Sequence, residues 1–304
     1  MLPIPSSRRI QTGPESSPGV CGSRAELNIA QKQRRHALIV PREHGAWGML
    51  LIPLLTGGAV GRFDGGRLFP VFLLTLVVLA LFWLRTPLES LLGTGSIRVQ
   101  TRQERQTVLA LIFPLATFAA VVLGALFWRG TYRNLIWLGT IAGAAFAAQI
   151  FLKKAGRATR MAAEVVGALT LTSTAPAAYC VATGRLDAKA WLLWLLNWLF
   201  AADQVHFVWL RIRGMRAEGL RNKLDVGWSF LAGNLLLAGI LMLARGLNLL
   251  PLVALLAFAP VLIRGLVWFV QAPRPIVVRR LGWAELAHAL VFGVLLTAGF
   301  GLIR

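Results

Sequence analysis

The sequence predicts an all-α protein, a polytopic bundle that crosses a membrane about nine times. Hydrophobic residues make up 57% of the chain and charged residues only 14%, whereas about a quarter of the residues of a soluble domain are charged. The apolar residues gather in nine runs, and about 20 apolar residues let a helix cross a hydrocarbon core of roughly 30 Å. The runs do not alternate apolar and polar residues as barrel strands do. Helices are therefore expected, because unpaired backbone groups cannot face lipid.

The nine expected spans follow one another along the chain. The first two, 46–61 and 67–84, are short, so their ends are less sharply defined. The other seven are expected at 108–128, 134–152, 164–183, 188–210, 226–244, 249–270 and 284–303. Most of these runs are far too long for buried strands.

Residues 1–43 differ from the rest of the chain and are expected to form a disordered basic tail on the cytoplasmic side. They are rich in Ser, Pro, Gly, Gln and Arg, a composition that buries too little apolar surface to fold. No apolar core of a secretory signal precedes Pro41, so we expect the first span to act as the targeting signal. Residues 44–304 are the expected transmembrane domain, and Cys21 and Cys180 are too far apart to suggest a disulfide framework.

The net charge of +20 is explained by the way the basic residues are distributed. With the N-terminus in the cytoplasm, 23 of the 32 Lys and Arg fall on the cytoplasmic side, 8 fall outside, and Arg264 lies within a span. This positive-inside pattern predicts an N-in, C-out protein of the plasma (inner) membrane. The same residues face anionic lipid, so a nucleic-acid partner is not expected.

The unusual polar residues of the spans all fall in the predicted cytoplasmic half. They are Glu43, His44, Arg85, Glu89, Glu164, Asp203, His206, Arg211, Asp225, Arg264, Glu285 and His288. In contrast, Asp64 and Asp187 are the only acids expected outside, in short loops. Chemistry is therefore expected at the cytoplasmic face.

Asp203 is the most informative of these residues because of its depth. It lies about 15 residues into its span, roughly 22 Å from the outer boundary at 1.5 Å per residue, and an acid inside a membrane marks a functional site by default. His206 follows three residues later on the same helix face and could act as a general base. The candidate catalytic residues are His206, Asp203 and His44, while snorkelling to the headgroups is the ordinary alternative for Arg85, Arg211 and Arg213.

The segment that opens the first span resembles the YwiC-like membrane proteins. That family begins its first helix with a His-Gly-Ala-Trp element followed by a Pro, and His44, Gly45, Ala46, Trp47 and Pro53 match it. Two further segments, beginning at Arg85-Thr-Pro-Leu and His206-Phe-Val-Trp, resemble other elements of the family. The resemblance implies an integral membrane protein and says little about activity.

A more distant resemblance, to the UbiA prenyltransferase superfamily, rests on nine spans and on the long polar connections 85–107 and 211–225. It implies a cytoplasm-facing cavity, an isoprenoid substrate and Mg²⁺ held by paired acids after the second and sixth helices. The chain departs from that pattern, because it has Arg85 and Glu89 at the first position and Asp203, His206 and Arg211 at the second. Mg²⁺ needs oxygen ligands, so Glu89 and Asp203 could hold at most one ion weakly.

A basic site favours direct binding of a phosphate instead. Arginine binds phosphate by paired hydrogen bonds, and the candidate substrate-binding residues are Arg85, Glu89, Arg211, Arg213 and Arg264. The leading hypothesis is a protein or UbiA-like transferase that binds an isoprenoid or lipid phosphate. A proton-coupled or small-molecule transporter, with Asp203 and His206 as relay groups, and a non-enzymatic membrane assembly factor are the alternatives.

Overall fold

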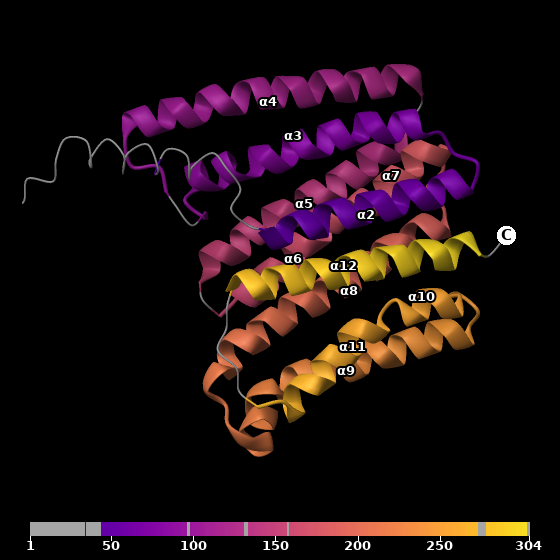
Figure 1. The fold of residues 1–304 in the computed structure, drawn as a ribbon. Helices are drawn as coiled ribbons and strands as arrows, with labels where there is room; N and C mark the ends of the chain where they lie inside the picture. Colours follow the sequence, from indigo (N-terminus) through magenta and orange to yellow (C-terminus); the bar gives the residue numbers. More distant parts are fainter. Residues whose placement is uncertain are drawn as a thin grey trace, which may run out of the picture.

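The structure is a computed structural model that describes Arg34 and residues 44–302, except 96–97, 131–132, 157 and 273–277. Within that part of the chain every regular element is a helix, and the long helices lie side by side in one bundle (Figure 1). The elements are α2 (His44–Phe63), α3 (Leu68–Leu92), α4 (Arg102–Arg129), α5 (Arg133–Ala155), α6 (Arg160–Thr172), α7 (Thr174–Thr183), α8 (Ala188–Arg213), η1 (Gly214–Arg216), α9 (Gly219–Gly246), α10 (Leu252–Leu256), α11 (Ala259–Val270) and α12 (Val278–Gly301). The expected tail at 1–43, with Cys21, lies outside the described residues apart from Arg34.

The prediction of a polytopic helical membrane protein is confirmed. Eight helices of the described chain are long and apolar enough to cross a membrane. The sixth expected span is the 26-residue helix α8, which is not among the eight and carries Asn197, Asp203, Gln204 and His206. The bundle thus contains a helical element for each of the nine expected runs.

Two expected spans are interrupted, which the sequence analysis did not anticipate. The fifth span divides into α6 and α7 at Ser173, and the eighth divides into α10 and α11 at residues 257–258. Pro176 and Pro260 follow these breaks. A proline has no N–H to bond the carbonyl four residues earlier, so Pro176 and Pro260 weaken the helices at these breaks. Proline alone does not break a helix here, because Pro53, Pro87 and Pro114 lie inside continuous helices.

Local capping explains several of the helix ends. Thr101 and Glu104 form a reciprocal capping box at the start of α4, and Asp187 accepts a hydrogen bond from the Ala190 N–H at the start of α8. Gly93 and Gly184 end α3 and α7 with φ angles of 71° and 75°, a left-handed conformation that favours glycine.

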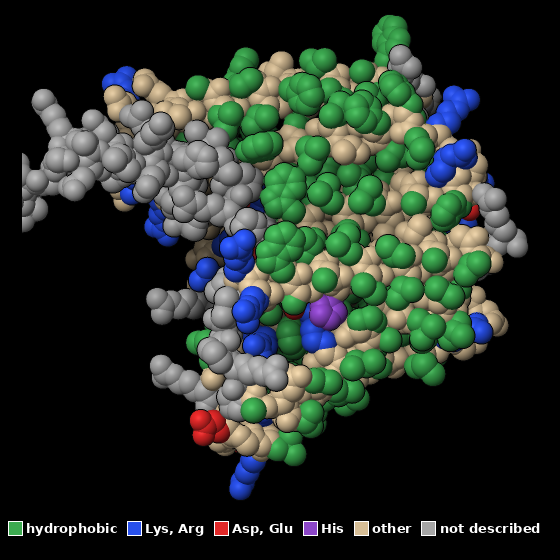
Figure 2. All heavy atoms as spheres, viewed as in Figure 1, with side chains coloured by type: hydrophobic (Ala, Val, Ile, Leu, Met, Phe, Trp, Pro, Cys, Tyr) green, Lys and Arg blue, Asp and Glu red, His purple; other side chains and the backbone are tan. Residues whose placement is uncertain are grey.

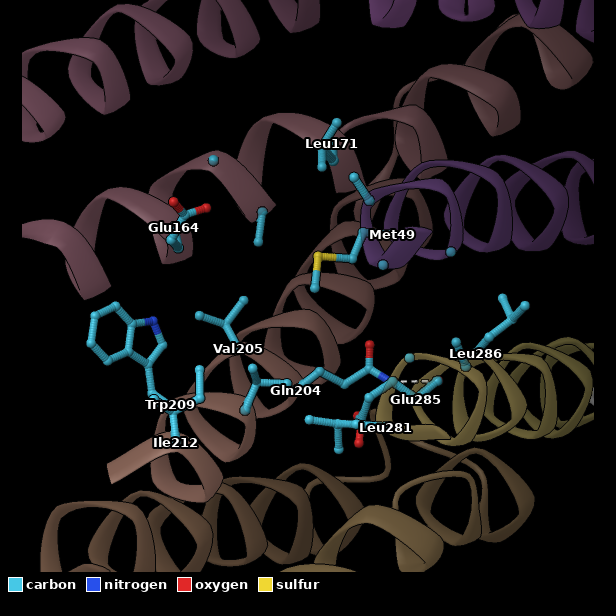
Figure 3. Close-up of a pocket in the computed structure, with 18 of the residues that line it drawn as sticks. Met49, Glu164, Leu171, Gln204, Val205, Trp209, Ile212, Leu281, Glu285 and Leu286 are labelled. Atoms are coloured by element: carbon cyan, nitrogen blue, oxygen red, sulfur yellow. Dashed lines mark hydrogen bonds between the residues drawn. The ribbon is translucent and has the colours of Figure 1, made fainter. Parts of the chain in front are cut away.

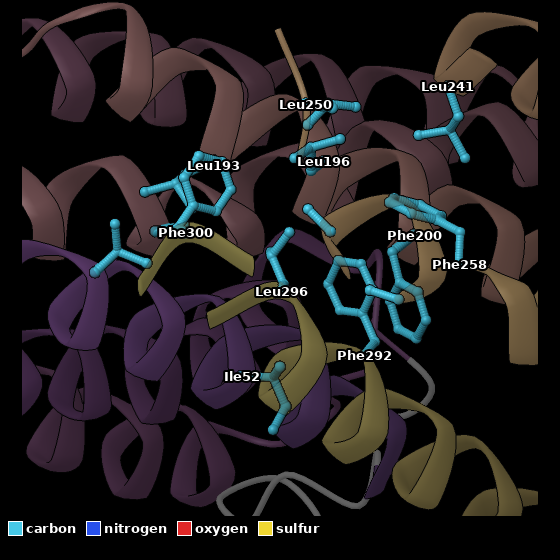
Figure 4. Packing of buried hydrophobic residues seen from close by; sticks show 14 of the residues in the cluster. Ile52, Leu193, Leu196, Phe200, Leu241, Leu250, Phe258, Phe292, Leu296 and Phe300 are labelled. Atoms are coloured by element: carbon cyan, nitrogen blue, oxygen red, sulfur yellow. The ribbon is translucent and has the colours of Figure 1, made fainter. Parts of the chain in front are cut away.

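The helices α2, α6 and α7 form the centre of the bundle. Of the most apolar 18-residue stretch of each candidate span, 61% is buried in Gly45–Phe63 and 72% in Arg160–Thr183, whereas no other candidate span exceeds 39%. Beside them, aromatic residues of α8 and α12 contribute to a core, where the Phe200 and Phe292 rings stack 4.0 Å apart (Figure 4). Phe258, at the break between α10 and α11, meets both rings edge-on. The break between α10 and α11 thus lies in the packed interior, where Ala257 and Phe258 are buried.

Small residues allow α2 and α7 to approach closely. A Cβ atom on Gly57 would lie 2.0 Å from the carbonyl oxygen of Ala175, and one on Gly61 would lie 2.7 Å from the Cβ of Ala182. Such contacts are typical of membrane helices, where close backbone packing replaces the hydrophobic drive that water provides.

The surface has the character of a membrane protein. Figure 2 shows apolar side chains over the middle of the bundle and Lys and Arg side chains toward its two ends. Large apolar side chains such as Phe113, Val121 and Trp137 are exposed on the described helices. A lipid bilayer is therefore the environment of the helices.

A polar network lies at the end of the bundle where α2 and α7 end and α8 begins. The Tyr179 hydroxyl donates to Asp64 at 2.7 Å, and Lys189 Nζ lies 2.7 Å from the same carboxylate oxygen. Burial alone would raise the pKa of Asp64, but the hydrogen bonds from Lys189 and Tyr179, with the charges of Lys189 and Arg185, outweigh it and lower the pKa below its usual range. The loop after α2 is thereby fixed to α7 and α8.

Candidate functional site

A cavity of about 610 Å³ opens among helices that begin or end at one end of the bundle, which we call the site end. At this end α2, α6 and α12 begin and α3, α5 and α8 end (Figure 1). This is the end that the sequence analysis expected to carry the polar residues. The volume of the cavity falls within the range of roughly 300–1,000 Å³ that is typical of small-molecule sites.

The cavity wall is largely apolar, with a few polar groups. Met49, Val205, Trp209, Ile212 and Leu286 provide apolar surface, and Figure 3 shows these side chains around one hollow. The polar members of the wall are Arg85, Gln149, Arg160, Glu164, Gln204 and Glu285. Such a wall suits an amphipathic ligand.

The first ion-pair cluster at the site end lies between α3 and α5. Glu89 accepts from Arg85 Nε at 3.0 Å and from Lys153 Nζ at 3.2 Å. The helix α3 continues past Pro87 to Leu92, which places Arg85 and Glu89 one turn apart on the same face. Because two cations share one carboxylate, this cluster carries an excess positive charge, and Arg85 forms part of the cavity wall.

The second cluster joins α8, α11 and α12. Arg264 donates to Asp203 at 3.2 Å and to Glu285, and its guanidinium lies 3.9 Å from the centre of the Phe207 ring. Gln204 Nε2 also donates to the Glu285 backbone carbonyl at 2.9 Å, the dashed line in Figure 3. Two carboxylates share one cation here, so this cluster carries an excess negative charge.

The structure separates His206 from this second cluster. Its Nε2 lies 3.4 Å from Ser229 Oγ, and its ring meets Phe230 edge-on at 5.2 Å, so the side chain faces α9. Neither His206 nor Asp203 forms part of the cavity wall. His44 begins α2, but its side chain lies outside the described part of the chain.

The candidate arginines Arg211 and Arg213 are also not part of the cavity wall. Arg213 stands over the Trp209 ring at 5.2 Å, and Arg211 borders a small hollow beside Lys223 and Trp268. The buried Lys223 donates to the carbonyls of Trp268, Phe269 and Gln271, where α11 ends. This amine therefore satisfies carbonyls that a helix end leaves unpaired.

Mg²⁺, which the resemblance to the UbiA superfamily implies, does not fit the described residues. The Glu89 carboxylate is taken up by two cations and that of Asp203 by Arg264, in two separate clusters. Across the described ranges, no group of three or more His, Cys, Asp or Glu could hold a metal ion.

Several polar residues at the cavity were not among the candidates from sequence. Gln149 and Gln204 are amides within apolar helices, which is a signal that the sequence contains. Gln149 Nε2 and Glu285 Oε1 are buried and have no hydrogen-bond partner among the described residues. Arg160 and Glu164 are visible in the sequence only as charges at the start of a span, and nothing there shows that they border a cavity.

Comparisons with known proteins agree with the resemblance of the first span. Residues 40–179 match the family model described as "YwiC-like protein". The chain is 27% identical over 258 residues to the uncharacterized protein YwiC of Bacillus subtilis (strain 168), a match that covers 84% of this chain and 95% of that protein. No solved structure matches the chain. The chain is a multi-pass membrane protein that is similar to the YwiC-like family over residues 40–179.

Proposed function

We propose that this protein binds an isoprenoid or lipid phosphate in the cavity at the site end of its bundle. The observation that carries the proposal is the position of Arg85 in the wall of a largely apolar cavity of about 610 Å³. The apolar wall would hold the tail of the ligand, and the polar groups would hold its head.

Arg85 is suited to bind a phosphate because only one nitrogen of its guanidinium donates a hydrogen bond to another described residue. Its Nε bonds Glu89, while its terminal nitrogens have no recorded partner among the described residues. Lys153 also pairs with Glu89, so the carboxylate does not depend on Arg85 alone. A guanidinium can bond phosphate through two nitrogens at once.

The proposed orientation places the site end in the cytoplasm. The support is the excess of Lys and Arg that flank the spans at this end, which is typical of cytoplasmic loops. The ligand would thus be held in the cytoplasmic half of the membrane, as in the arrangement that the UbiA resemblance implies.

Binding, rather than metal-assisted prenyl transfer, is the role we favour. Prenyl transfer of the UbiA kind depends on carboxylates that hold Mg²⁺, and here Glu89 and Asp203 are engaged with basic side chains. With the phosphate held by Arg85 directly, the site would bind or present a lipid without a metal.

Binding of geranyl phosphate to the purified protein tests the proposal, with Arg85→Met as the variant. We expect the variant to bind about ten- to 100-fold more weakly, because one charge-assisted hydrogen bond contributes roughly 1.5–3 kcal/mol. Arg221→Met is the matched control, since Arg221 is an exposed arginine at the same end but is not part of the cavity wall. Titration calorimetry in detergent measures both. Failure of wild type to bind either geranyl phosphate or a short-chain lipid phosphate, or equal losses in both variants, would refute the proposal.

Transport is the second candidate function, and the interrupted helices favour it. Broken spans often surround the substrate site of a transporter, and here α6–α7 and α10–α11 are both broken in the interior. Flux measurements in proteoliposomes distinguish the two functions: protein-dependent movement of protons would favour transport, and its absence with retained lipid binding would favour the first proposal.

A further inference from the structure

The cavity wall carries charges of both signs. Arg85 and Arg160 supply two cations, and Glu164 and Glu285 supply two carboxylates. A diphosphate with several negative charges would meet carboxylates as well as cations here. The balance of charge therefore favours a ligand whose own head group is neutral overall.

Two of these four charged side chains already form ion pairs with other residues of the protein. Arg85 is paired with Glu89, and Glu285 is paired with Arg264. Among the described residues, Arg160 and Glu164 have no recorded ion pair or hydrogen bond through their side chains. The Arg160 guanidinium and the Glu164 carboxylate are thus available to bind a ligand.

Arg160 and Glu164 lie one turn apart on α6, so their side chains share a face, with roughly 5–6 Å between Cβ atoms. The basic residue precedes the acidic one, which is the less favourable order for an ion pair within a helix. Arg160 is exposed and Glu164 is half-buried, so the cation lies nearer the mouth and the carboxylate deeper. Figure 3 shows Glu164 across the hollow from Trp209 and Val205 of α8.

We infer that α6 binds a zwitterionic head group, with the phosphate on Arg160 and an ammonium group on Glu164. The inference rests on the proposed function and narrows it to a lipid phosphate that also carries an amine. Arg85, on α3, lines the same cavity as Arg160 and adds a second donor for the phosphate. The ammonium group would give Glu164 the partner that the protein itself does not supply.

The test compares two short-chain probes that differ only in the amine. Dihexanoyl phosphatidylethanolamine carries an aminoethyl group on its phosphate, and dihexanoyl phosphatidylethanol carries a plain ethyl group, which lacks the ammonium. Binding of each to detergent-solubilised wild-type protein is measured by calorimetry, with geranyl phosphate as a third probe. We expect the amine to tighten binding at least about tenfold, which is the effect of one charge-assisted hydrogen bond.

Glu164→Gln is the informative variant, and Glu218→Gln is its matched control. Glu218 is exposed at the start of α9 and is not part of the cavity wall. We expect Glu164→Gln to bind the two probes equally, and Glu218→Gln to retain the wild-type preference. Because the wild-type comparison requires no variant, it remains decisive even if Glu164→Gln proves unstable.

Failure of this inference can be told apart from failure of the proposed function. Equal affinity of wild-type protein for the two matched probes, with geranyl phosphate still bound, would overturn the inference alone. A preference for the amine that survives in Glu164→Gln would overturn the assignment to Glu164. Absence of binding by all three probes would overturn the proposed function itself.

Discussion

Replacing Arg264 by Met should destabilise the bundle more than any substitution of an exposed arginine. The side chains of Arg264, Asp203 and Glu285 are only 12%, 6% and 9% exposed, so water screens their charges weakly. Removal of the cation leaves two carboxylates unpaired in the interior. Breaking a buried ion pair in this way costs about 3–5 kcal/mol, whereas an exposed pair contributes about 0–1 kcal/mol.

Methionine isolates the effect of the charge, because its thioether can keep the contact with the Phe207 ring that the guanidinium now makes. The triple variant Asp203→Asn, Arg264→Met and Glu285→Gln should recover most of the loss, since no buried charge then lacks a partner. Arg221→Met is the control and should change the free energy of unfolding by less than about 0.5 kcal/mol.

Unfolding of the purified protein by SDS in mixed micelles measures these differences, with the fluorescence of the 11 tryptophans as the signal. A single variant as stable as Arg221→Met would show that the cluster contributes no net stability. A triple variant less stable than the single one would show that the unpaired carboxylates are not the cause.

Two further predictions concern parts of the bundle away from the cavity. Asp64→Asn should lower the stability of the protein at neutral pH and make that stability depend less on pH in acid. Because the pKa of Asp64 is lowered in the folded protein, the stabilisation by its carboxylate is present at neutral pH and is lost as the pH falls below about 4. Thermal unfolding between pH 3 and 7 checks this, and identical curves for wild type and variant would contradict it. Gly57→Ala should cost about 1–3 kcal/mol, because its Cβ would overlap the Ala175 carbonyl. Gly143→Ala, where a Cβ meets open space, should be neutral or slightly stabilising in the same SDS titration.

Much of the fold could be predicted because apolar runs determine where membrane helices form. The runs expected at 134–152 and 188–210 became the helices Arg133–Ala155 and Ala188–Arg213. The interruptions of the fifth and eighth spans were missed, although Pro176 and Pro260 were visible. Hydropathy averages over a window and is nearly blind to one lost hydrogen bond.

The candidate site was predicted less completely, because partners distant in sequence depend on how helices pack. The pairing of Arg85 with Glu89 followed from their spacing on one helix, whereas Asp203 and Arg264 are 61 residues apart. His206 follows Asp203 by three residues, yet three residues advance a helix by about 300°, leaving a difference of about 60°. That angle directs His206 toward α9, while Asp203 meets α11.

The position of Arg264 has a consequence for the order in which the chain enters the membrane. It lies within the 19-residue segment Leu252–Val270, six residues before its end. An arginine at the centre of a nascent helix opposes release into lipid by about 2.5–3.5 kcal/mol, and the cost is smaller toward the end of the helix. One partner, Asp203, is synthesised earlier, and the other, Glu285, follows about 20 residues later. Stable insertion of this segment should therefore require that α8, which carries Asp203, is still beside the translocon. The helices from α8 to α12 would then enter the lipid together rather than one at a time.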